Sequence, residues 1–432
     1  MRYYSLNKQS PIVNFKEATI RGQAPDKGLY FPEQLPKVDE DLIRNIEKLP
    51  DAEIAFRVIE PYVGNEIPDQ DLFNIVKETI NFPIPLKPVT EKISSLELFH
   101  GPTLAFKDVG ARFMSRCLGY FLKNEKRNVT VLVATSGDTG GAVANGFYDV
   151  KGVNVVILYP KGRVSPVQEK QLTTLGKNII ALEVDGSFDD CQQMVKQAFA
   201  DAEINQKLFL TSANSINVAR WLPQQFYYFF AYKQWQEKNN PPVVCVPSGN
   251  FGNICAGMLA KITDLPLGHF IAACNVNDII SDYLITQELK PKNAVATLSN
   301  AMDVGNPSNF VRIIELFQNE FPLLKKNLSA FTITDDETKE TIKRIFNHNH
   351  YTLDPHGAVA FLALERFLQN NPAQKGFILE TAHPVKFPEA VEEATKTNIS
   401  IPPSLNELMG AEKKSVEINP VYADFRDYLM HL

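Results

Sequence analysis

The stretch FHGPTLAFKD at residues 99–108 contains the lysine that decides how this chain is interpreted. Lys107 follows a turn-forming segment and three apolar-rich residues, and it precedes an amphipathic segment at residues 109–121. A lysine at such a helix start is expected to be partly buried, and burial favours the neutral amine over the ammonium form. A neutral amine can form a Schiff base with an aldehyde cofactor. The ordinary alternative is a solvated surface lysine.

A second stretch, PSGNFGN at residues 247–253, predicts a site for a small phosphate group. It joins an apolar strand at 243–246 to a helical pattern at 254–261. Gly249 and Gly252 allow backbone N–H groups to converge on an anion at the helix N-terminus. No lysine follows the second glycine, which excludes a nucleotide P-loop, and the spacing is not that of a dinucleotide fingerprint. An ordinary strand-to-helix turn remains the alternative.

Lys107 and this phosphate loop together indicate pyridoxal phosphate, whose aldehyde needs a lysine and whose phosphate needs backbone amides. Here the chain resembles the threonine synthase family, which belongs to the fold type II group of pyridoxal-phosphate enzymes. The matching pieces appear in the family's order and include residues 1–5, 28–32, 99–108, 134–140, 214–220, 247–253 and 381–384. The resemblance implies an α/β fold of two parallel or mixed-sheet subdomains with the cofactor cleft between them, plus a small N-terminal domain.

The resemblance also implies roles for individual residues. Lys107 is the catalytic residue. The cofactor-binding residues are expected to be Lys107, Asp138, Gly249, Asn250, Phe251, Gly252, Asn253 and Thr381. The residues that bind the substrate phosphate are expected to be Thr135, Ser136, Thr139, Asn214 and Arg220. Thr381 would meet the pyridine nitrogen, although a threonine after a strand is also a common helix cap or turn residue.

Asp138 stands where related enzymes often carry asparagine, and an ionised carboxylate cannot donate a hydrogen bond. A bacterial subgroup of threonine synthases resembles this chain in carrying aspartate here, so the exact role of Asp138 is left open. The alternative is that Asp138 only caps a helix. His100 and His383 lie in matching motifs and are candidates for substrate or cofactor contact. His348 and His350 lack the i, i+4 spacing of a helical metal pair, and no metal is expected.

The activity implied is that of a lyase of threonine biosynthesis. It converts O-phospho-L-homoserine and water to L-threonine and phosphate, by γ-elimination of phosphate and β-addition of water. One alternative is another fold type II reaction, such as serine or threonine dehydration or cysteine synthesis, which needs no second phosphate site. The other is a catalytically silent paralogue that still binds pyridoxal phosphate.

Composition is typical of a globular protein of 432 residues with a large core. The net charge of −6 argues against non-specific nucleic-acid binding. No apolar run reaches the length of a membrane span, and residues 1–30 lack a secretory pattern. Five scattered cysteines without a C-x-x-C pair favour buried thiols in a reducing compartment. A cytoplasmic enzyme that acts as a monomer or homodimer on a small molecule is therefore expected.

Three prolines at residues 83–88 predict a boundary between an N-terminal domain, 1–88, and a catalytic body of two interleaved subdomains, 89–432. Beyond it, strands are predicted at residues 129–134, 153–159, 179–184, 243–246, 270–274 and 376–379. Helices are predicted at residues 41–48, 69–80, 140–148, 165–175, 189–200, 218–235, 309–317, 336–346, 357–368 and 388–396. This alternation is typical of parallel sheets covered on both faces. Because Thr135, Ser248 and Thr381 each follow a predicted strand, their motifs are expected to meet in one cleft.

Overall fold

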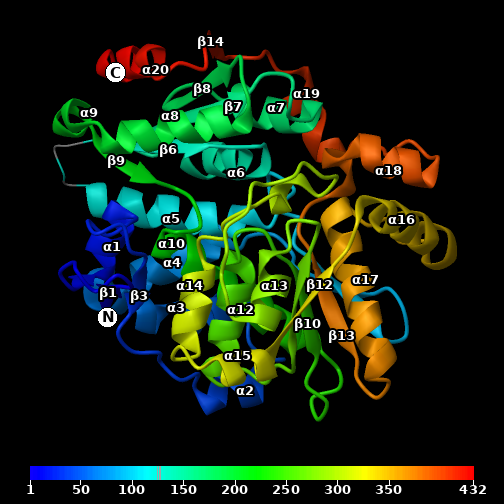
Figure 1. Cartoon of the computed structure of the whole chain (residues 1–432). Helices are drawn as coiled ribbons and strands as arrows, with labels where there is room; N and C mark the ends of the chain where they lie inside the picture. The colour runs from blue at the N-terminus through cyan, green and yellow to red at the C-terminus, as the bar shows by residue number, and fades with distance from the viewer. Residues whose placement is uncertain (124, 126–127) are drawn as a thin grey trace.

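Two sheets of unequal size, a larger mixed one and a smaller parallel one, organise the chain, and they form the lower and upper parts of the molecule in Figure 1. The computed structural model describes residues 1–123, 125 and 128–432. In that part of the chain the larger sheet has the strand order β12-β11-β10-β13-β5-β4, and the smaller has β14-β8-β7-β6-β9. The strands of the larger sheet are β4 (Leu86–Pro88), β5 (Ile93–Glu97), β10 (Val243–Pro247), β11 (Phe270–Cys274), β12 (Leu328–Thr332) and β13 (Gly376–Glu380). The strands of the smaller sheet are β6 (Val129–Ala134), β7 (Val153–Pro160), β8 (Ile179–Val184), β9 (Phe209–Ser212) and β14 (Val416–Ile418).

Helices bury both faces of the larger sheet, as its continuous apolar strands require. Successive residues of a strand point to opposite faces, so Val244 and Val246 pack with α12, while Val243 and Cys245 pack with α17. β4 alone of the described strands in this sheet runs antiparallel to its neighbour. The helices around the larger sheet are α10 (Val218–Trp221), α11 (Gln225–Gln234), α12 (Gly252–Ile262), α13 (Ile279–Thr286), α14 (Phe310–Leu316), α15 (Phe321–Asn327), α16 (Asp335–Asn349), α17 (Pro355–Asn370) and α18 (Pro388–Thr395).

The smaller sheet has its own cluster of buried side chains, to which the C-terminal helix contributes Phe425 and Leu429. Its helices are α6 (Asp138–Phe147), α7 (Pro166–Thr173), α8 (Phe188–Ala200), α9 (Ala202–Lys207), α19 (Asn406–Gly410) and α20 (Tyr422–Met430). α5 (Lys107–Leu122) packs against α6 and against α10, so it joins the two parts. The 3-10 helices are η1 (Gly64–Glu66), η2 (Leu222–Gln224), η3 (Asn300–Met302), η4 (Pro384–Lys386) and η5 (Pro403–Leu405).

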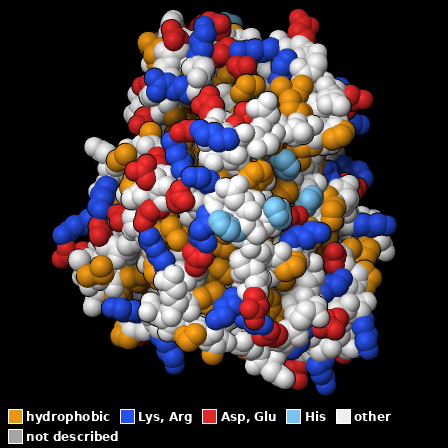
Figure 2. All heavy atoms as spheres, turned by 90° about the vertical axis from the view of Figure 1, so that its right-hand side faces the viewer, with side chains coloured by type: hydrophobic (Ala, Val, Ile, Leu, Met, Phe, Trp, Pro, Cys, Tyr) orange, Lys and Arg blue, Asp and Glu red, His pale blue; other side chains and the backbone are white. Residues whose placement is uncertain are grey.

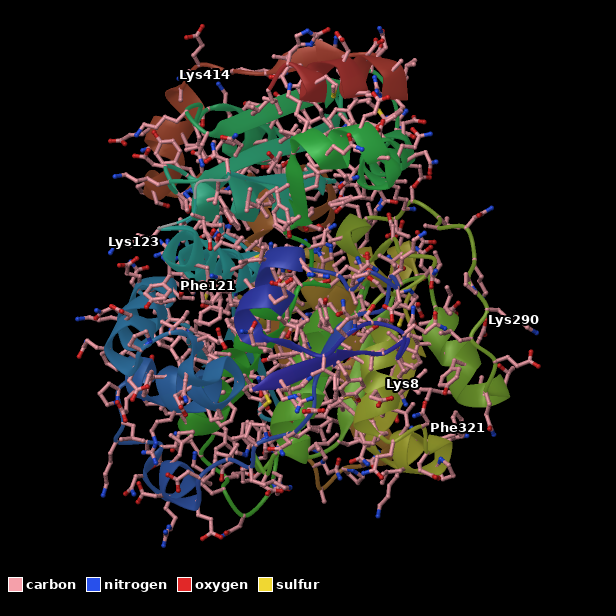
Figure 3. The ribbon with its side chains drawn as sticks, turned by 90° about the vertical axis from the view of Figure 1, so that its left-hand side faces the viewer. Lys8, Phe121, Lys123, Lys290, Phe321 and Lys414 are labelled. Carbon is pink, nitrogen blue, oxygen red and sulfur yellow. The ribbon has the colours of Figure 1, made fainter. Side chains whose placement is uncertain are left out.

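The N-terminal region, residues 1–88, packs against helices α5 and α11. Figure 3 shows this region, with Lys8 beside the N-terminal strands and Lys414 at the opposite, C-terminal end of the molecule. Its elements are β1 (Arg2–Ser5), β2 (Val13–Asn14), β3 (Tyr30–Pro32), α1 (Phe15–Arg21), α2 (Glu40–Asn45), α3 (Asp51–Val63) and α4 (Asp69–Thr79). Its buried side chains, including Tyr3 and Phe15, belong to the same core cluster as α5, α11 and α12.

The strands predicted from the sequence all form, and most predicted helices form with shifts of one to three residues at their ends. The single helix predicted at residues 218–235 is wrong. Pro223 lacks a backbone N–H and cannot continue an α-helix, and the segment is divided into α10, η2 and α11. All five cysteines are buried and free, as expected. Within the residues that the structure describes, no helix is both long and apolar enough to cross a bilayer.

Candidate active site

Lys107 is the first residue of α5, and the end of β13 lies directly beside it. The Phe106 N–H donates to the carbonyl of Thr381 at 2.8 Å, and the His383 N–H donates to the carbonyl of Leu104 at 3.0 Å. The side chain of Lys107 is only partly exposed. Burial lowers its pKa to about 8; Asp138 opposes this change, while Lys386 and Arg220 add to it. The structure thus gives Lys107 the half-buried helix-start position and lowered pKa that the sequence predicted.

The turn before Lys107 is held in a strained shape by Asp108. One carboxylate oxygen of Asp108 accepts the Thr103 hydroxyl at 2.5 Å, and the other accepts the Thr103 N–H at 2.9 Å. Leu104 has a φ of 55°, a left-handed conformation that is unfavourable for a branched residue. Such strain persists where surrounding contacts fix it, often at functional sites. Here it sets the direction in which Lys107 leaves the turn.

The loop at residues 247–253 forms the start of α12, as predicted. Its helix cap is Phe251, which has a φ of 60° and makes no side-chain cap hydrogen bond. The side-chain oxygen of Asn250 instead accepts the Ser308 hydroxyl at 3.0 Å, which fixes the loop from its far side. A Cβ at Gly249 would lie 2.7 Å from the carbonyl oxygen of Ala301, so only glycine fits against that backbone.

The same loop offers unused donors of the kind that a phosphate needs. Asn253 is buried; its side-chain oxygen accepts the Tyr228 hydroxyl at 2.8 Å, and its Nδ2 has no hydrogen-bond partner among the described residues. The first backbone N–H groups of a helix likewise have no partner within the helix and carry partial positive charge. The loop therefore fits the phosphate group of pyridoxal phosphate.

Asp138 forms a buried ion pair that the sequence did not reveal. Its Oδ1 lies 2.7 Å from Nζ of Lys386 and accepts a hydrogen bond from Nε2 of Gln168 at 2.9 Å. Although burial raises the pKa of Asp138, Lys386 and then Lys107 outweigh it and hold the pKa well below its usual range. Asp138 is therefore ionised and can only accept hydrogen bonds. Lys386 lies in the apolar context PVKF at 384–387, and this signal of a buried lysine was missed.

Three further residues of the predicted substrate group lie at the start of α6. The Thr135 hydroxyl accepts the N–H groups of Gly137 and Gly140 at 3.0 and 2.9 Å, so it caps the turn. Among the residues that the structure describes, no acceptor contacts the proton of this hydroxyl. Ser136 and Thr139 flank Gly137 in the same turn, and their assignment to the substrate phosphate stays a prediction.

Arg220 lies in α10, close enough to Lys107 to lower its pKa. Arg220 is buried, and it donates from Nη1 to the Ala213 carbonyl, while its Nε has no hydrogen-bond partner in the described residues. Burial lowers the pKa of Arg220 to about 10, yet the guanidinium stays charged at neutral pH. Asn214 precedes it in the loop after β9. A buried guanidinium with a free donor is suited to a second anion.

A buried arginine fixes the loop that carries Asn214 and Arg220. The Arg312 guanidinium donates to the carbonyls of Ser215 and Ile216, at 3.1 and 2.6 Å, and to the carbonyl of Tyr30 at 3.0 Å. Its planar group also lies over the Trp221 ring, with 4.3 Å from Cζ to the ring centre. The N-terminal region thus supports the loop from behind. The sequence contained no motif that could have identified Arg312.

Buried acids lie behind Thr381 and the phosphate loop. Glu380 accepts the Asp354 N–H at 2.7 Å, and burial raises the pKa of Glu380 well above its usual value, with Asp354 adding to the effect. Asp354 also contacts Nδ1 of His356 at 2.5 Å. Nε2 of His356 accepts the N–H of Ala301 at 3.2 Å. This chain of contacts positions the backbone on which Gly249 rests.

The remaining histidine candidates lie at the edge of the site or away from it. Nε2 of His100 contacts Glu97 at 2.7 Å, and burial lowers the pKa of His383 to about 4, so this imidazole is neutral. A cavity of about 310 Å³ adjoins His383. Figure 2 shows histidine side chains close together on one face, with charges of both signs around them. Contact of His100 and His383 with substrate or cofactor stays a prediction.

Comparison with known proteins identifies the family. The family model "Pyridoxal-phosphate dependent enzyme" matches residues 94–380, and models of the threonine synthase N-terminus and C-terminus match residues 2–80 and 357–428. Threonine synthase from Escherichia coli is 44% identical over the whole of both chains, and its crystal structure superimposes with a TM-score of 0.92. A pyridoxal-phosphate-bound threonine synthase from Brucella melitensis has a TM-score of 0.94 and 35% identity, covering 100% of this chain and 99% of that one. The arrangement of two α/β sheets that joins Lys107 to a phosphate loop is therefore that of a pyridoxal-phosphate enzyme, and this chain belongs to the threonine synthase family.

Proposed function

We propose that the protein converts O-phospho-L-homoserine and water to L-threonine and phosphate. The observation that carries this proposal is the buried guanidinium of Arg220 near Lys107. Arg220 lies close to Lys107 but on a different segment from the phosphate loop at residues 249–253. One loop is suited to the cofactor phosphate, which leaves a buried guanidinium for a phosphate on the substrate.

The chain's own residues have distinct tasks in this proposal. Bound pyridoxal phosphate supplies an electron sink for the substrate's carbanion. The backbone N–H groups of residues 249–253 and the Asn253 amide would hold the cofactor phosphate, and the Thr381 hydroxyl would be the partner of the pyridine nitrogen. Lys107 would hold the cofactor's aldehyde, and its amine would take and return protons at the α and β carbons of the substrate.

Substrate binding belongs to the loop after β9 and the start of α6. Arg220 and Asn214 hold the phosphate that leaves from the γ carbon, and Thr135, Ser136 and Thr139 complete its surroundings. The departure of phosphate creates negative charge, which a fixed buried guanidinium stabilises without rearrangement. We also propose that residues 1–88 act as an N-terminal domain that supports this loop, since Tyr30 and Thr19 accept hydrogen bonds from Arg312 and Asn217.

The competing dehydratase and silent-paralogue interpretations are less favoured. Dehydration expels a β-hydroxyl group and does not need Arg220 in a phosphate site. A silent paralogue does not need Lys107 to be free for proton transfer. The full-length identity to threonine synthases also favours the proposed reaction.

The test combines a chemical label with two activity assays. Borohydride reduction of the purified, cofactor-loaded protein, followed by peptide mapping, should place the cofactor on Lys107. Inorganic phosphate should be released from O-phospho-L-homoserine, and ammonia should not be released from serine at a comparable rate. Loss of phosphate release in Lys107→Ala is expected, and full activity of that variant would overturn the proposal. Ammonia release without phosphate release would instead support a dehydratase.

A further inference from the structure

Lys386 is a completely buried lysine that none of the site's predicted tasks uses. Its side chain is 0% exposed, and Nζ contacts Oδ1 of Asp138 at 2.7 Å and donates to the Thr103 carbonyl at 2.8 Å. It comes from η4, which follows the larger sheet, whereas Asp138 begins α6 beside the smaller sheet. Burying an ammonium group is costly unless it is paired and hydrogen-bonded, and Lys386 has both kinds of partner.

The position of this pair matters because it lies against the turn that leads to Lys107: Lys386 donates to the Thr103 carbonyl of that turn, and the Phe106 N–H donates to the carbonyl of Thr381. Asp138 is the carboxylate that raises the pKa of Lys107, and Lys386 lowers it. A nearby carboxylate favours the charged form of an amine, in which the nitrogen lone pair holds a proton. Asp138 would therefore become the counter-ion of Lys107 if nothing else occupied it. Gln168 and Lys386 both occupy the same oxygen of Asp138 instead.

We propose that Lys386 is a positioning residue of the active site, which offsets the charge of Asp138 so that this carboxylate holds the Lys107 proton less tightly and the amine can react with pyridoxal phosphate. In that reaction the nitrogen lone pair attacks the aldehyde carbon. Both amine hydrogens then leave with the aldehyde oxygen as water, and a C=N bond forms. An ammonium group has no lone pair to start this step.

This inference also gives Asp138 a role. Asp138 and Lys386 together are neutral, so they can stand in the place of a single neutral asparagine without adding charge to the site. The other charged groups that surround Lys107 are Arg220 on α10 and, near Lys386 and Arg220, Asp108 on α5. Removing Lys386 alone would leave Asp138 free to pair with Lys107. Removing both members of the pair would leave the charge around Lys107 unchanged.

The experiment compares Lys386→Met, Asp138→Asn and the double variant in the full-length protein after removal of the cofactor. Pulses of acetic anhydride at a series of pH values, followed by mass spectrometry of the Lys107 peptide, give the pH at which half of Lys107 is reactive. In Lys386→Met this midpoint should rise by about 1 to 3 pH units. In Asp138→Asn it should fall, and in the double variant it should return close to that of the unmodified protein. Lys261→Met, which removes another partly buried lysine, should not change it.

The rate of cofactor uptake from added pyridoxal phosphate at pH 7 should fall as this midpoint rises. Uptake should therefore be slowest in Lys386→Met and fastest in Asp138→Asn. An unchanged midpoint in Lys386→Met overturns the inference. If that variant does not fold, an unchanged midpoint in Asp138→Asn overturns it. The inference rests on Lys107 being the cofactor lysine. Borohydride labelling of a different lysine would reject the proposed function, whereas labelling of Lys107 with unchanged midpoints would reject only the role of Lys386.

Discussion

Replacing Gly249 by alanine should weaken cofactor binding more than any other single methyl group added to the phosphate loop. The new Cβ would lie 2.7 Å from the carbonyl oxygen of Ala301 and 2.9 Å from Cα of Met302. Both are backbone atoms, and the N–H of Ala301 is held by His356, so neither can turn away as a side chain can. Overpacking of this kind costs about 1–3 kcal/mol. If the loop relieves it by leaving its phosphate-binding shape, the dissociation constant for pyridoxal phosphate rises about 5- to 150-fold.

The assay is a titration of the cofactor-free protein with pyridoxal phosphate, monitored by absorbance. Two glycine variants serve as controls. At Gly252 the nearest atoms are the side chains of Ser215 and Asn309 at 3.1 and 3.3 Å, so alanine should have a smaller effect. At Gly410 a Cβ meets nothing within 4 Å, and alanine should leave affinity unchanged. Wild-type affinity in Gly249→Ala would show that this loop does not bind the cofactor in the shape described.

Further predictions concern ionisation, support of the loop and the second anion site. Because the pKa of Glu380 is raised in the folded protein, the native state keeps a proton that the unfolded chain releases above about pH 4.5. Thermal stability should therefore fall as the pH rises above about 4.5 towards the raised pKa of Glu380. Glu380→Gln, which cannot ionise, should remove this pH dependence in calorimetry. Cofactor uptake should accelerate with pH and level off above about 8, where Lys107 is neutral, as stopped-flow absorbance can show. Arg312→Met leaves three backbone carbonyls without their donor and should lower the free energy of unfolding by about 3 kcal/mol or more in urea titrations; an unchanged urea midpoint would contradict the role given to this arginine. Arg220→Met should raise the KM for O-phospho-L-homoserine at least tenfold while leaving pyridoxal-phosphate affinity nearly unchanged, since a charged hydrogen bond contributes about 1.5–3 kcal/mol.

Local sequence patterns predicted those elements whose apolar residues follow a single period. The apolar runs of β6, β7, β8, β10 and β11 were predicted almost to the residue, because strands buried on both faces are apolar throughout. β5 was missed because its sequence ISSLE contains adjacent serines, although Ser95 is buried and accepts the Tyr351 hydroxyl. α3 was missed because Pro61 lies within it, near its C-terminal end.

The site residues likewise divide into those recognisable from a local segment and those that depend on distant residues. Lys107 and the loop at 249–253 were found because each lies in a compact segment whose chemistry is visible from neighbouring residues. Lys386 and Arg312 were not found, since their partners lie far away in the sequence, at residues 138 and 30, for example. A buried charge is identified by its partner, and only the folded structure shows which partner that is. The roles of Asp138, Asn214, Thr135, Ser136 and Thr139 remain predictions.

The pairing of β5 with β13 has a consequence for how the protein matures during translation. β13 lies between β10 and β5, so residues 93–97 reach the rest of the larger sheet only after residues 376–380 have been synthesised. Thr381 and Lys386, which lie against the turn of Lys107, follow immediately. Pairings between such distant segments form late because a long loop must close first. A nascent chain that ends before residue 376 therefore exposes the edge of β5 and cannot yet retain its cofactor, which makes cofactor capture one of the final events of its folding.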